Sequence, residues 1–148
     1  MLSPPQTFAA EESGFRELVA FPKEDLVELH GSIVAREGLL ESDPGLVEKF
    51  IRGTVKGLLH ARDKSVETIA VLARYMKVRE NYAAKNYELA RLAMTADGTV
   101  SEELQKKAIQ HVVERVGLKE SPALEKVFNF SLARKIYTEL KTKGWKAK

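Results

Sequence analysis

The segment with the clearest potential for chemistry is ADGTVSEEL, at residues 96–104. A glycine after an acidic residue, with a glutamate downstream, resembles a calcium-binding EF-hand loop. With Gly98 at loop position six, three ligand positions carry no carboxylate. These are Ala93, Thr95 and Leu104. Asp97 alone remains as a ligand, so the register argues against calcium and predicts a turn in which Ser101 caps the next helix.

The remaining titratable residues do not form a metal site or an acid–base pair. The three histidines have no partner four residues away and no zinc-type carboxylate pattern; they are His30, His60 and His111. The acidic pairs Glu11–Glu12 and Glu102–Glu103 are adjacent, so on a helix they point roughly 100° apart, and negative charge at a helix start explains them better. No phosphate loop, nucleophile elbow or Ser/His/Asp signature occurs. We therefore expect no enzyme activity, no metal and no cofactor.

Composition narrows the protein class. The 148 residues fit one domain. The absence of cysteine excludes disulfides, thiolate metal sites and cysteine nucleophiles. No apolar run approaches the roughly 20 residues of a membrane-spanning helix. Residues 1–20 lack the basic and apolar regions of a signal peptide, so the chain as written is expected to stay in the cytoplasm.

The C-terminal tail holds most of the excess positive charge. The net charge is only +3, from 24 Lys and Arg against 21 Asp and Glu, and four tail lysines surround Trp145. They are Lys141, Lys143, Lys146 and Lys148. Such a tail can contact phosphates or a base. We prefer the interpretation that it is solvated and complements the negative end of the last helix.

Two kinds of element are expected to position these residues. Ser3 should cap a short helix whose first position is Pro4 and which Gly14 ends. The stretches 15–21 and 32–35 are short, apolar and bounded by Gly or Pro, which predicts two strands, and Val127 and Phe128 should also be extended. The fold class is therefore α+β, mainly helical, with about five helices and two or three short strands.

Five longer helices are predicted from apolar residues at i, i+3 and i+4. They should begin near Pro44, Ser65, Glu80, Ser101 and Ser131. Ser42 or Asp43 should cap the first of them, and Asn129 or Ser131 the last. Among the residues expected on their inner faces are Leu46, Phe50, Val66, Val112 and Val116.

Four segments, in this order, resemble a known family: SPPQTFAAEESGFREL, GSIVAREGLLESDPGLVEKFIRGTVKGLLHA, DGTVSEELQKKAIQHVVERVG and VFNFSLARKIYTELKTKGW. They are similar to the C-terminal half of nitrate/sulfonate/taurine-type ABC transporter solute-binding proteins, a group that includes thiamine-precursor binders. The resemblance covers nearly the whole chain. Its most specific parts are SDPGLVEKFIRGTVKG and DGTVSEE.

The resemblance implies the C-terminal part of a periplasmic-binding-protein type II fold, in which a small organic solute lies between two lobes. Residues 1–36 would be a remnant of the second lobe and the hinge strand, and residues 37–148 the helical C-terminal part of the first lobe. The N-terminal half, with the signal peptide, would be missing, so Met1 would correspond to an internal position. The location would be periplasmic or extracytoplasmic, and an ABC permease would be the partner.

The same resemblance implies a binding site for the solute. Four residues would form a loop at the cleft, where backbone groups and a helix N-terminus can face an anionic or polar ligand. They are Ser3, Pro4, Pro5 and Gln6. An ordinary helix that starts at proline is an equally good interpretation of these residues.

Two further expectations concern partners. The rival function is a small basic helical interaction module with nucleic acid as one candidate partner, although nucleic acid is not the partner we expect. If the N-terminal half is missing, apolar surface is left bare, and the chain is predicted to form a homodimer or to swap elements. The buried contacts would include Phe15, Val19, Ile33 and Val34. The alternative is that the helices collapse into a smaller core.

Overall fold

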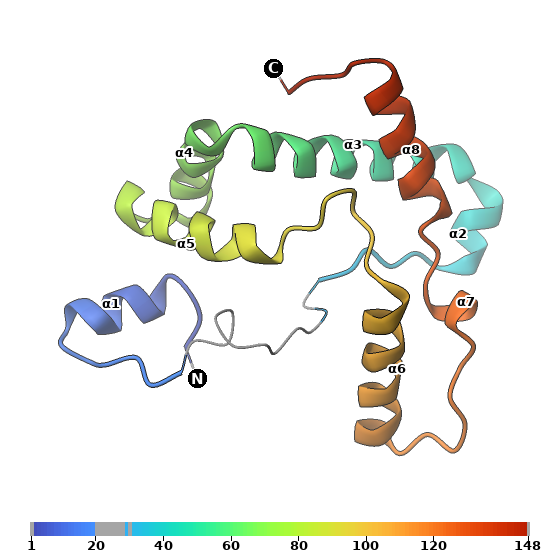
Figure 1. The fold of residues 1–148 in the computed structure, drawn as a ribbon, viewed down its shortest axis with the longest axis horizontal. Coiled ribbons are helices and arrows are strands. Elements are labelled where there is room, and N and C mark those ends of the chain that lie inside the picture. The colour runs from blue at the N-terminus through green and yellow to red at the C-terminus, as the bar shows by residue number, and fades with distance from the viewer. Residues whose placement is uncertain (1, 20–28, 30, 148) are drawn as a thin grey trace. The chain divides into compact units, whose positions relative to one another are not determined.

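The computed structural model describes residues 2–19, 29 and 31–147, and all regular structure in these ranges is helical (Figure 1). Eight helices lie within them: α1 Gln6–Glu12, α2 Glu37–Ser42, α3 Pro44–Asp63, α4 Ser65–Met76, α5 Glu80–Ala93, α6 Glu102–Val116, α7 Leu124–Val127 and α8 Ser131–Thr142. None of the helices in these ranges is long and apolar enough to cross a membrane.

The α+β fold class predicted from the sequence is wrong, because the described residues contain no strand. Residues 15–19 and 32–35 have no regular structure, and the rest of the first predicted strand, residues 20 and 21, lies outside the described residues. A strand obtains its hydrogen bonds from a neighbouring strand, and none is described here. Val127 was also predicted to be extended but ends α7, whereas Phe128 is extended as predicted.

The chain divides into two compact units, which are described separately. Unit 1 contains α1, the end of α3 from His60, α4 and α5. Unit 2 contains α2, α3 up to Leu59, and α6 to α8. The predicted division into residues 1–36 and 37–148 refers to the lobes of a larger protein and stays a prediction.

All five predicted long helices begin where the sequence indicated. The Asp43 side chain accepts a hydrogen bond from the Leu46 amide at 2.9 Å, which decides for Asp43 over Ser42 as the cap of α3. Ser101 accepts from the Leu104 amide and caps α6. The N-cap of α8 is Phe130, without a side-chain cap bond, so the prediction that Asn129 or Ser131 caps this helix is wrong. Asn129 instead accepts from the Ser131 amide at 3.1 Å in the turn before α8. The caps of α3 and α6 are local, so the sequence is enough to predict them.

Four helices end in the same kind of turn, in which an amide bonds to the carbonyl five residues earlier. The donor–acceptor pairs are Phe15–Ala10, Val78–Ala73, Leu118–Val113 and Trp145–Leu140. Each donor is apolar, as is common in this motif. The preceding residue has positive φ; it is glycine after α1, α6 and α8, but Lys77, with φ 55°, after α4. Of these four residues, only Lys77 carries a side chain, and that side chain makes the left-handed conformation sterically unfavourable.

The core of unit 2 forms where α8 packs on α3 (Figure 1). Val55 and Leu59 of α3 meet Ile136 and Leu140 of α8, and Ile136 is fully buried. Four partly buried side chains pack around them: Ile51, Leu132, Tyr137 and Trp145. Trp145 thus belongs to the folded core although it follows the last helix.

Unit 1 is built on the α4–α5 hairpin. Ala83 and Tyr87 of α5 are fully buried. The Tyr87 hydroxyl donates a hydrogen bond to the Ala61 carbonyl at 2.8 Å. Ala61 lies in the last turn of α3, where carbonyls lack partners within the helix. Tyr87 therefore ties the end of α3 to α5.

Candidate functional site

The predicted binding residues Ser3, Pro4, Pro5 and Gln6 form one turn at the start of α1. The Gln6 amide donates to the Ser3 carbonyl at 3.0 Å. The helix begins at Gln6, with Pro5 as its N-cap and no side-chain cap bond, so the prediction that Ser3 caps a helix starting at Pro4 is wrong. The two prolines have no amide hydrogen. The first backbone amide after Ser3 that can donate is therefore that of Gln6, and it donates to the Ser3 carbonyl.

The turn presents polar groups, but it does not enclose them. Ser3 and Gln6 are exposed, whereas Pro4 and Pro5 are half-buried. The hydroxyl of Thr7, the next residue, is buried without a hydrogen-bond partner in the described part of the chain. Ligand binding at the turn stays a prediction.

Aromatic and cationic side chains hold α1 against α5. Phe8 of α1 is buried, and its ring lies 5.8 Å from that of Tyr82 at an angle of 52°. The Lys85 ammonium lies over the Phe8 ring at 5.5 Å. Arg79 lies over the Tyr82 ring at 4.5 Å and donates to the Tyr82 hydroxyl at 2.6 Å. The turn before α1 is therefore attached to a folded unit.

Ion pairs reinforce the same contact. Arg79 donates a hydrogen bond to Glu12, and Lys85 lies 4.0 Å from Glu11. The hydrogen bond with Tyr82, and after it that with Arg79, lowers the pKa of Glu12. The hydrogen bond with Glu12 raises the pKa of Tyr82. Glu11 and Glu12 thus have structural partners.

This arrangement corrects one interpretation of the sequence. Glu11 and Glu12 lie at the C-terminal end of α1, not at a helix start, so the helix dipole disfavours them. Two cations compensate: Arg79, the N-cap of α5, and Lys85 within α5. Sequence reasoning missed this contact. The available signal was the pattern RENYAAK at residues 79–85, in which two cations flank an aromatic residue at a spacing of three. This pattern does not indicate which helix packs against it.

The other candidate sites prove to be local structure. Asp97 accepts hydrogen bonds from the amide and the hydroxyl of Thr99, at 2.9 and 2.8 Å, so its carboxylate closes the turn. Glu102 and Glu103 begin α6, as predicted, and pair with lysines one turn later. His60 lies 3.6 Å from Glu67. Among the described residues no group of three potential ligands could hold a metal ion; His30 lies outside them.

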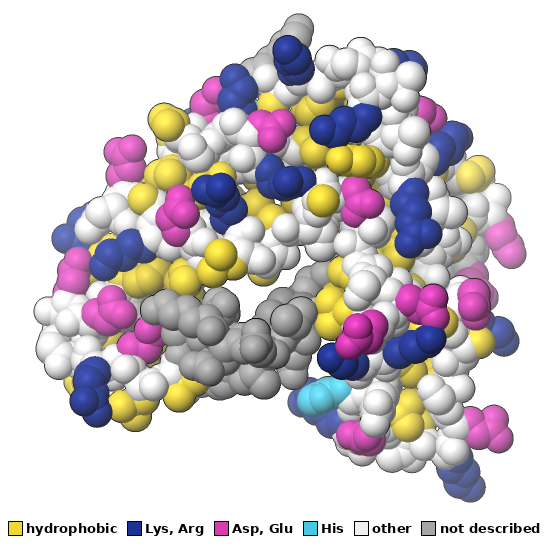
Figure 2. Space-filling model, viewed as in Figure 1, with side chains coloured by type: hydrophobic (Ala, Val, Ile, Leu, Met, Phe, Trp, Pro, Cys, Tyr) yellow, Lys and Arg dark blue, Asp and Glu magenta, His cyan; other side chains and the backbone are white. Residues whose placement is uncertain are grey.

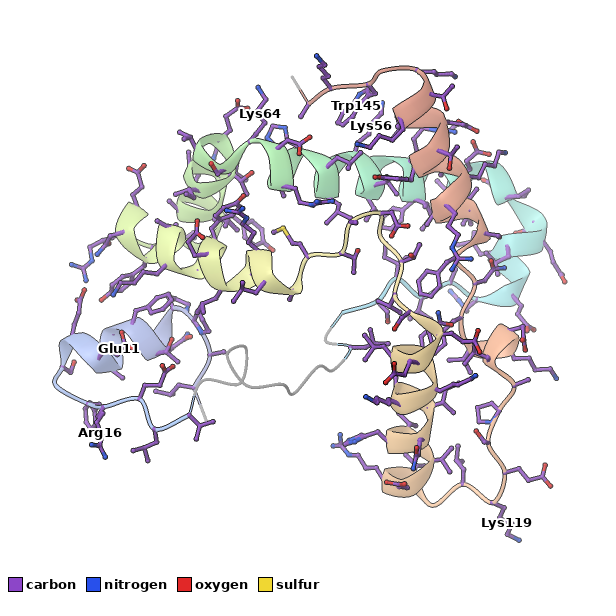
Figure 3. The ribbon with its side chains drawn as sticks, viewed as in Figure 1. Glu11, Arg16, Lys56, Lys64, Lys119 and Trp145 are labelled. Carbon is purple, nitrogen blue, oxygen red and sulfur yellow. The ribbon has the colours of Figure 1, made fainter. Side chains whose placement is uncertain are left out.

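The tryptophan of the tail is not free to stack on a base. Trp145 is half-buried against the core of unit 2. The Lys56 ammonium, from α3, lies over its ring at 5.8 Å. Lys141 lies over the Tyr137 ring at 5.6 Å. Figure 3 shows Lys56 beside Trp145. Sequence reasoning missed Lys56 because it is distant from the tail along the chain.

The best-formed hollows of the described residues are open grooves on α6. One, of about 170 Å³, is lined by apolar side chains that include Val112, Leu118 and Phe128. The other groove, of about 250 Å³, is lined in part by the polar side chains of Lys106 and Gln110. Both are smaller than the roughly 300–1,000 Å³ of typical small-molecule sites. A closed solute pocket would need further protein around it.

Several apolar side chains predicted to be buried are exposed. On α3, Leu46 and Phe50 lie one turn apart and are 51% and 59% exposed, and Val112 and Val116 are similarly bare on α6. Val66 of α4 is also exposed. Four side chains predicted to be buried by association are exposed in the single chain, so their burial stays a prediction: Phe15, Val19, Ile33 and Val34. Figure 2 shows hydrophobic side chains at the surface.

Comparison with protein-family models found no match, and searches among curated proteins and solved structures likewise found none.

Proposed function

We propose that this chain belongs to the solute-binding component of an ABC importer for a small organic solute, such as a sulfonate, a nitrate-like anion or a thiamine precursor. The observation that carries the proposal is the presence, in order, of the four segments that resemble this family. The helices α3, α6 and α8 begin inside three of these segments, and α3 and α6 begin at the predicted caps. An ABC permease is the proposed partner, and the proposed location is extracytoplasmic.

The exposed apolar surface supports the idea that this chain packs against further protein. Leu46 and Phe50 lie on one face of α3, next along the chain to Leu39 and Leu40 of α2, which are 39% and 46% exposed. Soluble monomers rarely leave large apolar patches bare. The open hollows on α6 also support packing against further protein, because these grooves by themselves do not enclose a solute.

The turn Ser3–Gln6 is the proposed solute contact. The exposed Gln6 side chain offers both a donor and an acceptor. Unit 1 anchors the turn, because Phe8 is buried against Tyr82 just after it. An anchored turn loses less conformational entropy on binding than a free terminus would.

Calorimetric titration tests this site. We expect weak heat of binding, because this chain alone does not enclose the solute, from one of three solutes: an alkyl sulfonate, nitrate or a pyrimidine precursor of thiamine. Gln6→Ala should weaken that binding about three- to tenfold, the loss of one net hydrogen bond. Asn81→Ala is the matched control, since Asn81 is an exposed amide on α5 of the same unit. Equal effects of the two substitutions, or no binding of any solute, would contradict the assignment of the turn.

A further inference from the structure

Four lysines gather around the C-terminal end of α8, in a region without carboxylates of its own. They are Lys56, Lys141, Lys143 and Lys146, here called the lysine surface. The chain from residue 141 to residue 147 contains no Asp or Glu. Within the described part of the chain, none of the four lysines forms an ion pair. Their charge is therefore available to a partner.

The nearby carboxylates are already engaged. Glu139 of α8 pairs with Arg52 at 2.8 Å, and Glu48 pairs with the same Arg52 at 2.7 Å. The hydrogen bond with Arg52, and then the charge of Lys135, lowers the pKa of Glu48. These two glutamates thus balance Arg52 and Lys135 and do not offset the lysine surface.

The fold fixes this surface around Trp145. The Trp145 amide bonds to the Leu140 carbonyl at 2.9 Å, and Gly144 takes the left-handed conformation that this turn requires. The Trp145 ring packs on the core, and the Lys56 ammonium lies over its face. Lys143 and Lys146 flank this turn in sequence, so they are displayed by a folded element.

We propose that the lysine surface binds the anionic headgroups of a lipid membrane. It offers several ammonium charges, each of which can meet any phosphate in a fluid layer. Nucleic acid fits less well. Trp145 and Tyr137 are half-buried against the core and have Lys56 and Lys141 over their rings, which leaves little ring surface for a base, and the surface has no arginine to form a bidentate bond to a base. This inference does not depend on the proposed function.

Vesicle binding tests the proposal, with Trp145 as the reporter because it is the chain's only tryptophan. The intact chain is titrated with vesicles of equal parts phosphatidylglycerol and phosphatidylcholine, and with phosphatidylcholine alone. We expect a change in Trp145 fluorescence with the anionic vesicles, suppressed by salt because screening weakens exposed charges. The double substitution Lys141→Gln/Lys143→Gln should weaken binding about 25-fold, from about fivefold for each lysine.

The matched control is Lys119→Gln/Lys126→Gln. Both lysines are exposed, both belong to unit 2, and neither forms an ion pair in the described chain. Figure 3 shows Lys119 far from Lys56 and Trp145 within this unit. The control removes the same charge and should leave vesicle binding nearly unchanged.

Three results would overturn the proposal. The first is that anionic vesicles do not bind. The second is that both double variants weaken binding equally, which would mean that net charge alone acts. The third is that duplex DNA binds more tightly than the vesicles and depends on the same lysines, with log K falling against log salt by about 0.9 for each phosphate contacted. Circular dichroism should show that all variants keep the helical fold.

Discussion

Replacing Tyr87 with phenylalanine tests how unit 1 is held together. Tyr87 is fully buried, and its hydroxyl donates to the Ala61 carbonyl at 2.8 Å. Phenylalanine keeps the ring and removes only the donor, so the change creates almost no cavity. The cost has two parts, the lost hydrogen bond and the carbonyl left without its partner, and together they should lower the free energy of unfolding by about 1–2 kcal/mol.

The assay is urea unfolding followed by circular dichroism. The midpoint should fall while the slope against urea stays the same, because the surface exposed on unfolding does not change. Tyr75→Phe is the matched control. Tyr75 lies on α4 and is 84% exposed, so its loss of a hydroxyl should change stability by less than about 0.5 kcal/mol. If Tyr87→Phe is no more destabilising than Tyr75→Phe, the hydrogen bond to Ala61 does not tie α3 to α5.

Three other predictions concern stability. Lys77→Gly should stabilise the chain by about 0.5–1 kcal/mol in thermal unfolding, since glycine adopts the φ of 55° without strain; a loss of stability would argue against the left-handed turn. Thr68→Val should raise stability by about 1 kcal/mol, because the Thr68 hydroxyl is buried without a partner in the described residues; a drop would mean that the hydroxyl is bonded. The pKa of Glu12 is lowered from 4.5 by Tyr82 and Arg79, so its contribution to stability is present above pH 4.5 and is lost as the pH falls through the lowered value; Glu12→Gln should reduce this loss in acid melts, and an unchanged pH profile would contradict the pairing.

The starts of the long helices could be predicted because each depends on a few neighbouring residues. Asp43, Ser101 and Asn129 all act within three residues of their positions. Strands could not be predicted from neighbouring residues in the same way. A β-branched stretch such as residues 32–35 forms a strand only with a partner, and the sequence does not say whether one is near.

In the candidate sites, too, contacts between near neighbours in sequence could be predicted and contacts between distant residues could not. The turn at Asp97 was correctly predicted because its partner, Thr99, is two residues away. The contact between Arg79 and Glu12, and that between Lys56 and Trp145, join residues far apart in sequence, and a single sequence does not pair them. Val55 and Leu59 of the predicted α3 face are buried, but Leu46 and Phe50 of the same face, and Val112 and Val116 of α6, were also predicted to be buried because they are apolar. Their exposure depends on what packs there, and periodicity does not report that.

Uptake of labelled solutes by source cells tests the proposed importer role most directly. Cells with and without the gene would be compared for an alkyl sulfonate, nitrate and a pyrimidine precursor of thiamine, and the gene would be returned on a plasmid. We predict that uptake of one solute falls on deletion and recovers on return. Unchanged uptake of all three by the deleted strain would contradict the proposal that this chain belongs to such an importer.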